Sequence, residues 1–141
     1  MPERGEPINV IGLRFELFVS DVAKTVRFYQ ATLGLNPPEG HELEGYVPLS
    51  SGVVTIGVQR PDGLHAGHHF SPANLAGPRG VGVEIVIEVA DVDAAYLTAS
   101  ANAAIHGGTC EDIKERPWKT KDFRLIHPDG YYIRVTSLRV A

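Results

Sequence analysis

The chain has 141 residues, of which 43% are hydrophobic and 21% charged, a composition typical of one globular domain with a substantial core. Its formal net charge of −4 leaves no basic footprint for nucleic acid, and no apolar run is long enough to cross a bilayer. The start of the chain is polar and Cys110, the single cysteine, cannot form an internal disulfide. We therefore expect a cytoplasmic protein with an ordinary, unreactive thiol.

The first predicted elements are a strand over residues 13–19 and a helix over residues 22–33. Every second residue from Leu13 to Val19 is apolar, so this face of the strand is expected to pack against the core. The opposite face carries Arg14, Glu16 and Phe18. Ser20 or Asp21 is positioned to cap the helix, and Gly34 follows its last turn.

The same order returns in the second half of the chain, which indicates an internal duplication. A strand is predicted over residues 83–89, with its odd-numbered residues facing the core, and Asp91 then caps a second helix. Further strands are expected after each helix, over 45–60 and as a hairpin over 121–138 that turns at Pro128-Asp129-Gly130. The proline- and glycine-rich stretch 60–80 is expected to be a linker without regular structure.

Three sequence features resemble the vicinal oxygen chelate superfamily of glyoxalases, bleomycin-resistance proteins and extradiol dioxygenases. They are "VSDVAKTVRFYQATLGL" in the first half, "PW" at residues 117–118, and "HPDGYYIRV" near the end. The resemblance implies one α+β domain over residues 1–141, made of two βαβββ modules that form a curved mixed sheet around a pocket, with helices on the convex side. Module one would cover about 10–60 and module two about 81–141. It also implies a homodimer, either side by side or with exchanged modules.

The resemblance further implies where a metal would be held in metal-dependent relatives, and this chain departs from that pattern. The corresponding positions carry Arg14, Glu84, Arg134 and either Thr55 or Gly57. Arginine stays protonated and offers no lone pair to a cation, so we expect neither a metal nor another cofactor there. Arg14, Glu84 and Arg134 are instead expected to meet, either as a structural ion-pair network or as an anchor for a ligand's carbonyl, phenolate or carboxylate.

Aromatic side chains are expected to line the pocket beside these charges, and the candidates for its walls are Phe18, Tyr46, Phe70, Tyr131 and Tyr132. Trp118 matches the position of a tryptophan beside the drug groove of bleomycin-resistance relatives, and ordinary packing is the alternative. The histidines at 65, 68 and 69 are interpreted as a solvated loop, and His127 as part of a turn. The full set of predicted ligand-binding residues is Arg14, Glu16, Phe18, Thr55, Gly57, Glu84, Trp118, Tyr132 and Arg134.

These features favour a metal-independent protein that binds and sequesters a bulky, partly aromatic small molecule, such as an antibiotic or another natural product. In this interpretation there are no catalytic residues. The alternative is a metal-independent cyclase, isomerase or epimerase acting on a natural-product intermediate, with Glu16 or Glu84 as acid or base. A metal-dependent glyoxalase or dioxygenase would require a different strand register.

Overall fold

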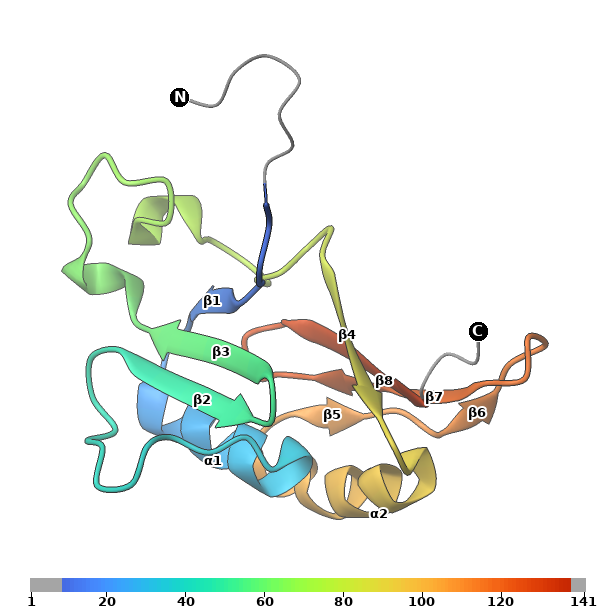
Figure 1. Ribbon diagram of the computed structural model, residues 1–141. Helices are drawn as coiled ribbons and strands as arrows, with labels where there is room; N and C mark the ends of the chain where they lie inside the picture. The colour runs from blue at the N-terminus through green and yellow to red at the C-terminus, as the bar shows by residue number, and fades with distance from the viewer. Residues whose placement is uncertain (1–8, 138–141) are drawn as a thin grey trace.

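A computed structural model describes residues 9–137 (Figure 1); residues 1–8 and 138–141, at the two ends of the predicted domain, lie outside the described part. The helices are α1 (Val22–Leu33) and α2 (Val92–Asn102), with short 3-10 turns at Pro61–Gly63, Pro72–Asn74 and Ala104–His106. The strands are β1 (Phe15–Phe18), β2 (Val47–Ser51), β3 (Val54–Gln59), β4 (Glu84–Val89), β5 (Thr109–Cys110), β6 (Lys114–Glu115), β7 (Lys121–Ile126) and β8 (Tyr132–Ser137).

The strands form two hydrogen-bonded sheets, one from each half of the chain. In the first, β3 lies between β1, which is parallel to it, and β2, which is antiparallel. In the second, β8 lies between parallel β4 and antiparallel β7, and β7 also pairs with β5 and β6. The predicted α+β class is confirmed. Within residues 9–137, however, the two sheets do not join into the single continuous sheet that the resemblance implies.

The helix ends follow the predicted capping residues. Asp21 accepts a hydrogen bond from the Lys24 amide at 3.0 Å, and Asp91 accepts one from the Ala94 amide at 3.0 Å. Each carboxylate satisfies a backbone donor that has no partner within the first turn of a helix. Gly34 ends α1 in the left-handed conformation, with φ of 67°, which a glycine adopts without a steric penalty.

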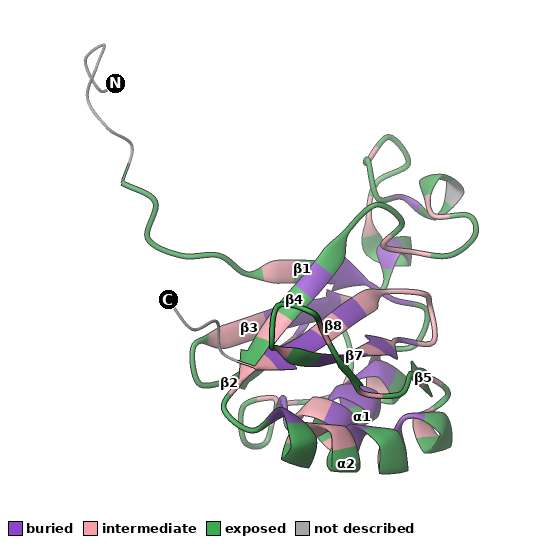
Figure 2. Ribbon diagram, turned by 90° about the vertical axis from the view of Figure 1, so that its right-hand side faces the viewer, coloured by how far each residue is buried: buried purple, intermediate pink, exposed green. Residues whose placement is uncertain are grey.

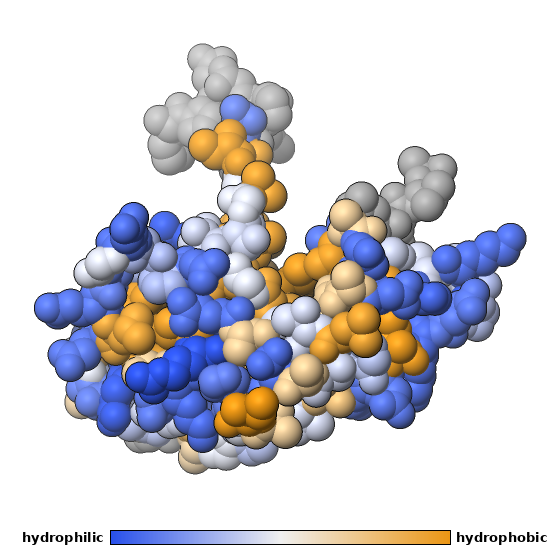
Figure 3. All heavy atoms as spheres, turned by 90° about the horizontal axis from the view of Figure 1, so that it is seen from below, coloured by the Kyte–Doolittle hydropathy of each residue, from blue (hydrophilic) through white to orange (hydrophobic). Residues whose placement is uncertain are grey.

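The core lies between the sheets and the two helices, which pack against each other (Figures 1 and 2). Figure 3 shows that the face beneath the helices is mostly hydrophilic, with scattered hydrophobic patches. This arrangement leaves the other face of each sheet available for a binding site. The largest fully buried side chains are Tyr29, Phe28, Phe123, Leu49, Ile56, Leu125, Ile133, Val19, Val26, Val47, Val58 and Val135.

Three expectations from the sequence are wrong in detail. Leu13 and Val83 were expected to face the core, but they precede β1 and β4 and are 81% and 52% exposed. Alternation places a side chain on a face only where a strand is paired into a sheet, and these positions are not. The stretch 60–80 contains two 3-10 turns rather than no regular structure, each with a proline at its start.

None of the helices in the described residues has the length and apolar character to cross a membrane.

Candidate ligand-binding site

The predicted site residues lie on two different sheets, but Glu16 and Phe18 from the first module and Tyr132 from the second line one cavity between the modules. Arg14, Glu16, Thr55 and Gly57 lie on or beside the first sheet, and Phe18 points from its edge into the cavity between the modules. Glu84, Tyr132 and Arg134 lie on the second sheet, and Trp118 lies in the loop before β7. The expected meeting of Arg14 with Glu84 and Arg134 does not occur, because Arg14 pairs with Glu16 instead, at 2.9 Å.

Glu16 is the centre of the first group. Its Oε1 accepts a hydrogen bond from the Tyr46 hydroxyl at 2.9 Å and lies 2.9 Å from Arg14 Nε. Partial burial and the Glu16 carboxylate raise the pKa of Tyr46, so the phenol stays protonated and acts as a donor. Gly57 is opposite Glu16 in the β1–β3 register, and a Cβ there would overlap both the carboxylate and the phenol. The absence of a side chain at Gly57 therefore makes room for this pair.

A cavity of about 530 Å³ lies between the two modules. Phe18 forms one wall and stacks on Phe70 of the linker, with ring centroids 4.8 Å apart. Val83 and Ile85 contribute from the second module. The linker, which was expected to lack regular structure, therefore supplies a wall of this largely apolar cavity through Phe70, one of the aromatic residues expected to line the pocket.

The second group is held by an ion pair and a buried carboxylate. Arg134 Nε donates to Glu84 Oε1 at 2.8 Å, and Arg134 Nη1 lies 3.8 Å from Asp122 Oδ2. Asp122 is completely buried and also receives hydrogen bonds from Arg116 and Arg124, at 2.6 to 2.9 Å. The predicted pairing of Glu84 with Arg134 is therefore present, and it belongs to a larger cluster.

The sequence interpretation missed Asp122, Arg116 and Arg124. Alternation along β7 places Asp122 and Arg124 on the same face, and the hairpin at residues 128–130 makes β7 and β8 neighbours. In the observed register, Arg124 is directly opposite Arg134. That register was available from the predicted hairpin and would have revealed two of the three residues. Arg116 reaches the cluster through the β6–β7 turn, which has no comparable sequence signal.

Trp118 and Arg134 line a larger cavity of about 850 Å³ on the second sheet. Trp118 lies at the tip of a tight turn in which the Arg116 amide donates to the Thr120 carbonyl at 2.7 Å. Its side chain is 64% exposed, so the indole is not part of the core and forms one side of an open pocket. The other lining residues are Val86, Glu88, Lys119, Thr120, Thr136 and Ser137.

The side chains at the metal positions of relatives do not fit a metal. Two are arginines, and the carboxylate of Glu84 is already paired with Arg134. A transition metal needs three or four donors with available lone pairs. More widely, no three His, Cys, Asp or Glu residues between positions 9 and 137 form a group suited to a metal ion. The linker histidines His65 and His68 contact each other through their rings, with centroids 5.3 Å apart, but they too are not part of such a group in the described residues.

Cys110 has the properties of an unreactive thiol. Burial, followed by the nearby Asp112 and Glu111 carboxylates, raises its pKa to about 11. A thiol with this pKa is almost entirely protonated at neutral pH and is a poor nucleophile. This supports the interpretation from the sequence.

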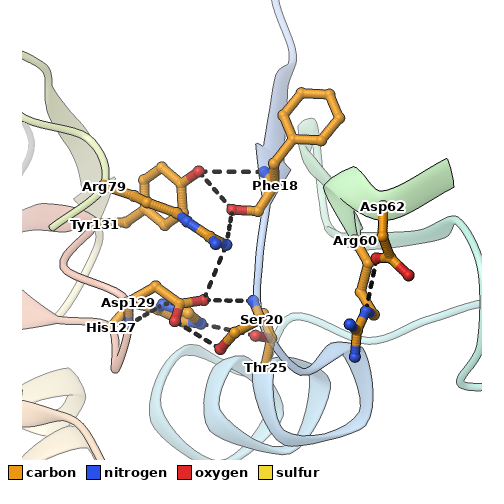
Figure 4. A network of polar contacts seen from close by, with 9 residues as sticks. All are labelled: Phe18, Ser20, Thr25, Arg60, Asp62, Arg79, His127, Asp129 and Tyr131. Atoms are coloured by element: carbon orange, nitrogen blue, oxygen red, sulfur yellow. Dashed lines mark hydrogen bonds and ion pairs between the residues drawn. The ribbon is translucent and has the colours of Figure 1, made fainter. Parts of the chain in front are cut away.

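A polar network joins the β7–β8 turn to the start of α1 (Figure 4). The Ser20 amide and hydroxyl donate to the Asp129 carboxylate at 2.8 and 2.7 Å. Arg79 Nη1 and the Tyr131 hydroxyl each donate to the Phe18 carbonyl at 2.8 Å. We call Phe18, Ser20, Arg79, Asp129 and Tyr131 the clasp, because they tie both modules and the linker together beside the cavity between them.

His127 lies just inside the clasp, in the predicted turn. Its Nδ1 accepts a hydrogen bond from the Asp129 amide at 2.9 Å, and its Nε2 lies 2.7 Å from Thr25 Oγ1. The ring is 2% exposed and stacks on Tyr29. The predicted turn role is confirmed, and the contact with α1 extends it.

Two modules of a strand, a helix and further strands, with open sheet faces opposite the helices, define a class of α+β ligand-binding and catalytic proteins. Residues 11–135 match the Glyoxalase/Bleomycin resistance protein/Dioxygenase superfamily. The chain belongs to this superfamily. A comparison with curated proteins found no match.

Solved structures share the fold at low sequence identity. A glyoxalase/bleomycin resistance protein/dioxygenase from Nocardioides has a TM-score of 0.69 and 18% identity, over 94% of this chain and 86% of that one. The bleomycin-binding protein of bleomycin-producing Streptomyces verticillus, complexed with copper(II)-bleomycin, has a TM-score of 0.61 and 20% identity, over 94% of this chain and 100% of that one. A glyoxalase-related enzyme from Fulvimarina pelagi has a TM-score of 0.65 and 14% identity, over 93% of this chain and 89% of that one. At these identities the likeness shows the fold alone.

Proposed function

We propose that this protein binds and sequesters a bulky, partly aromatic small molecule, of the antibiotic or natural-product class, without a metal. The observation that carries the proposal is the 850 Å³ cavity with Trp118 on one side and Arg134 on another. Its volume suits a drug-sized ligand, and an exposed indole offers a flat apolar surface on which an aromatic ring can stack.

Two further observations support this function. The metal positions of relatives carry arginines and an ion-paired glutamate, which suit binding of a polar ligand group better than metal-assisted chemistry. A structural neighbour that is a bleomycin-binding protein shows that the fold can hold a large natural product.

We also propose that the protein is a homodimer, in which the two groups of site residues come together from different chains. Glu16 with Tyr46 on the first sheet and Glu84 with Arg134 on the second form separate pairs within one chain. An exchange of modules would bring the first sheet of one chain against the second sheet of its partner. The predicted residues that one chain keeps apart, such as Arg14 and Arg134, would then line one shared pocket.

The function can be tested with the fluorescence of Trp118, the only tryptophan. Anthraquinone-2-carboxamide, a neutral three-ring probe and quencher, is titrated into the protein, and bleomycin is titrated separately. We expect saturable quenching by the anthraquinone. In calorimetry, Trp118→Ala should weaken its binding by roughly 1–3 kcal/mol, the usual effect of losing an aromatic anchor.

Leu97→Ala provides the matched control, because Leu97 is a 69% exposed residue of α2 outside the cavity linings and should leave binding unchanged. If Trp118→Ala binds the anthraquinone as tightly as the parent, the aromatic wall is not a binding surface. The proposed function then loses the observation that carries it.

A second candidate function, a metal-independent cyclase, isomerase or epimerase, is favoured by the Glu16–Tyr46 pair. A carboxylate hydrogen-bonded by a protonated phenol at 2.9 Å offers both an acid and a base to a bound substrate. Mass spectrometry separates the two functions if the protein is isolated with its natural ligand and incubated. A sequestering protein releases the molecule with its mass and retention time unchanged, whereas an enzyme releases an altered compound.

A further inference from the structure

Three arginines surround one buried carboxylate on the second sheet. Asp122 Oδ1 accepts hydrogen bonds from Arg116 Nη2 at 2.6 Å and Arg124 Nη1 at 2.7 Å. Asp122 Oδ2 accepts none from the described residues and faces Arg134 Nη1 at 3.8 Å. The guanidinium groups are thus gathered around a single anchor and are oriented by it.

This arginine cluster (Arg116, Arg124 and Arg134) carries more positive than negative charge. Its ion pairs among the described residues are to Asp122 and Glu84, so three cations are matched by two anions. The three arginine side chains are only 23–25% exposed, which limits the compensation that water can provide. An additional anion would restore the balance.

The strand register is a second indication that like charges are held close together in this cluster. Arg124 on β7 is directly opposite Arg134 on β8, and like charges in this position destabilise a sheet. Asp122 relieves only part of the repulsion, because its contact with Arg134 is long. Groups held in an unfavourable arrangement by the fold are typical of binding sites.

The cluster has free donors that face a cavity. Arg134 uses Nε for Glu84, and its two terminal nitrogens make no hydrogen bond to the described residues. The same side chain lines the 850 Å³ cavity together with Trp118 and Lys119, while Glu88 is the one acidic residue in that lining. Glu111 and Asp112 line a smaller cavity with Arg116 and Arg124, but neither forms an ion pair with the cluster in the described part of the chain.

We propose that the arginine cluster is an anion subsite, so that the ligand of this cavity is an aromatic acid. The carboxylate binds the terminal nitrogens of Arg134, whose planar group can hold both of its oxygens, and the aromatic body lies against Trp118. Arg116 and Arg124 add positive charge near Arg134, and the Asp122 carboxylate orients their guanidinium groups. The inference rests on the proposed function and narrows it to one class of ligand.

The test uses two probes that share one aromatic body. Anthraquinone-2-carboxylate and its neutral carboxamide are titrated into the full-length protein at low ionic strength, and dissociation constants are measured by calorimetry. We expect the carboxylate to bind about tenfold more tightly, the scale of a hydrogen-bonded charge. Higher salt should reduce this preference without changing binding of the carboxamide.

Two substitutions should change the preference for the carboxylate probe over the carboxamide in opposite directions. Arg134→Gln leaves Asp122 with its three hydrogen bonds from Arg116 and Arg124 and should bring both probes to within about threefold of each other. Glu84→Gln removes the carboxylate that competes for Arg134 and should strengthen binding of the acid alone. Because an unfolded variant cannot bind more tightly, this gain excludes loss of structure as the explanation.

Arg60→Gln is the control for net charge, since Arg60 is 59% exposed and paired only with Asp62 within the described residues; it should leave the preference unchanged. Equal binding of the two probes by the parent, or a full preference in Arg134→Gln, would overturn the anion subsite while leaving the proposed function intact. If neither probe binds at millimolar concentration, the proposed function itself fails, and this inference fails with it.

Discussion

At the scale of single residues, His127 shows how burial fixes a protonation state. Its Nδ1 accepts the Asp129 amide proton, so the ring proton is on Nε2 and is donated to Thr25 Oγ1. Burial lowers the pKa of His127 to about 4, despite the opposing effect of the Asp129 carboxylate. A second proton would occupy Nδ1 and break the hydrogen bond that shapes the turn.

We therefore predict a loss of stability in mild acid that depends on His127. The unfolded chain binds a proton below pH 6.5, whereas the folded protein resists it until about pH 4. The contribution of neutral His127 is complete above pH 6.5 and falls by about 3 kcal/mol as the pH approaches 4. Urea unfolding at several pH values should show this slope, and His127→Gln should flatten it. An unchanged slope in His127→Gln would assign the acid sensitivity to other groups.

At the scale of elements, local signals in the sequence were sufficient to predict the helix ends and the hairpin turn. They were not sufficient to predict which side chains of different elements meet. The caps at Asp21 and Asp91, the stop at Gly34 and the turn at residues 128–130 depend on a few neighbouring residues, and all are present. Contacts between elements depend on strand register and on which strands pair. The position of Arg14 and the cluster around Asp122 follow from such pairing, so the sequence interpretation misplaced the first and missed most of the second.

The clasp leads to a prediction about how the elements hold together. Asp129→Ala removes two hydrogen bonds from Ser20 and the ion pair with Arg79, leaving the Ser20 amide without its acceptor. We expect a loss of roughly 2–3 kcal/mol in the free energy of unfolding. Ser20→Ala removes only the hydroxyl bond and should cost about 1 kcal/mol.

The matched control for the clasp is Asp62→Ala. Asp62 also pairs with an arginine, but on the surface (Figure 4), and its loss should leave the urea midpoint unchanged. If Asp129→Ala resembles Asp62→Ala, the clasp contributes nothing to stability.

At the scale of the whole molecule, two open strand edges and exposed apolar side chains suggest an interface. β1 pairs only with β3 and β4 only with β8 in the described residues, so each has an edge that could pair with another chain. The segment before β1 extends from the body (Figures 1 and 3) with Val10, Ile11 and Leu13 at least 81% exposed. Val83, beside β4, is 52% exposed.

We predict that sedimentation at tens of micromolar protein will give a mass twice that of the 15.3 kDa chain. Leu13→Glu combined with Val83→Glu should shift the protein to a monomer, because buried charges at an apolar interface are unfavourable. Leu97→Glu, on the outer surface of α2, should not. A parent protein that sediments only as a single chain would contradict the dimer.

The clasp also has a consequence for the order in which the protein can be completed during synthesis. The donors on Ser20 find their acceptor 109 residues further along the chain. At the usual speed of a ribosome, roughly 5–20 residues per second, the first module waits on the order of ten seconds for that acceptor. Towards the end of this interval β1, α1 and β3 have all been synthesised, but the second module that packs against Phe18 is still incomplete. Within one chain, the clasp can therefore close only after the turn between β7 and β8 has been made, and we expect a chain truncated before residue 129 to leave the Ser20 donors without their acceptor.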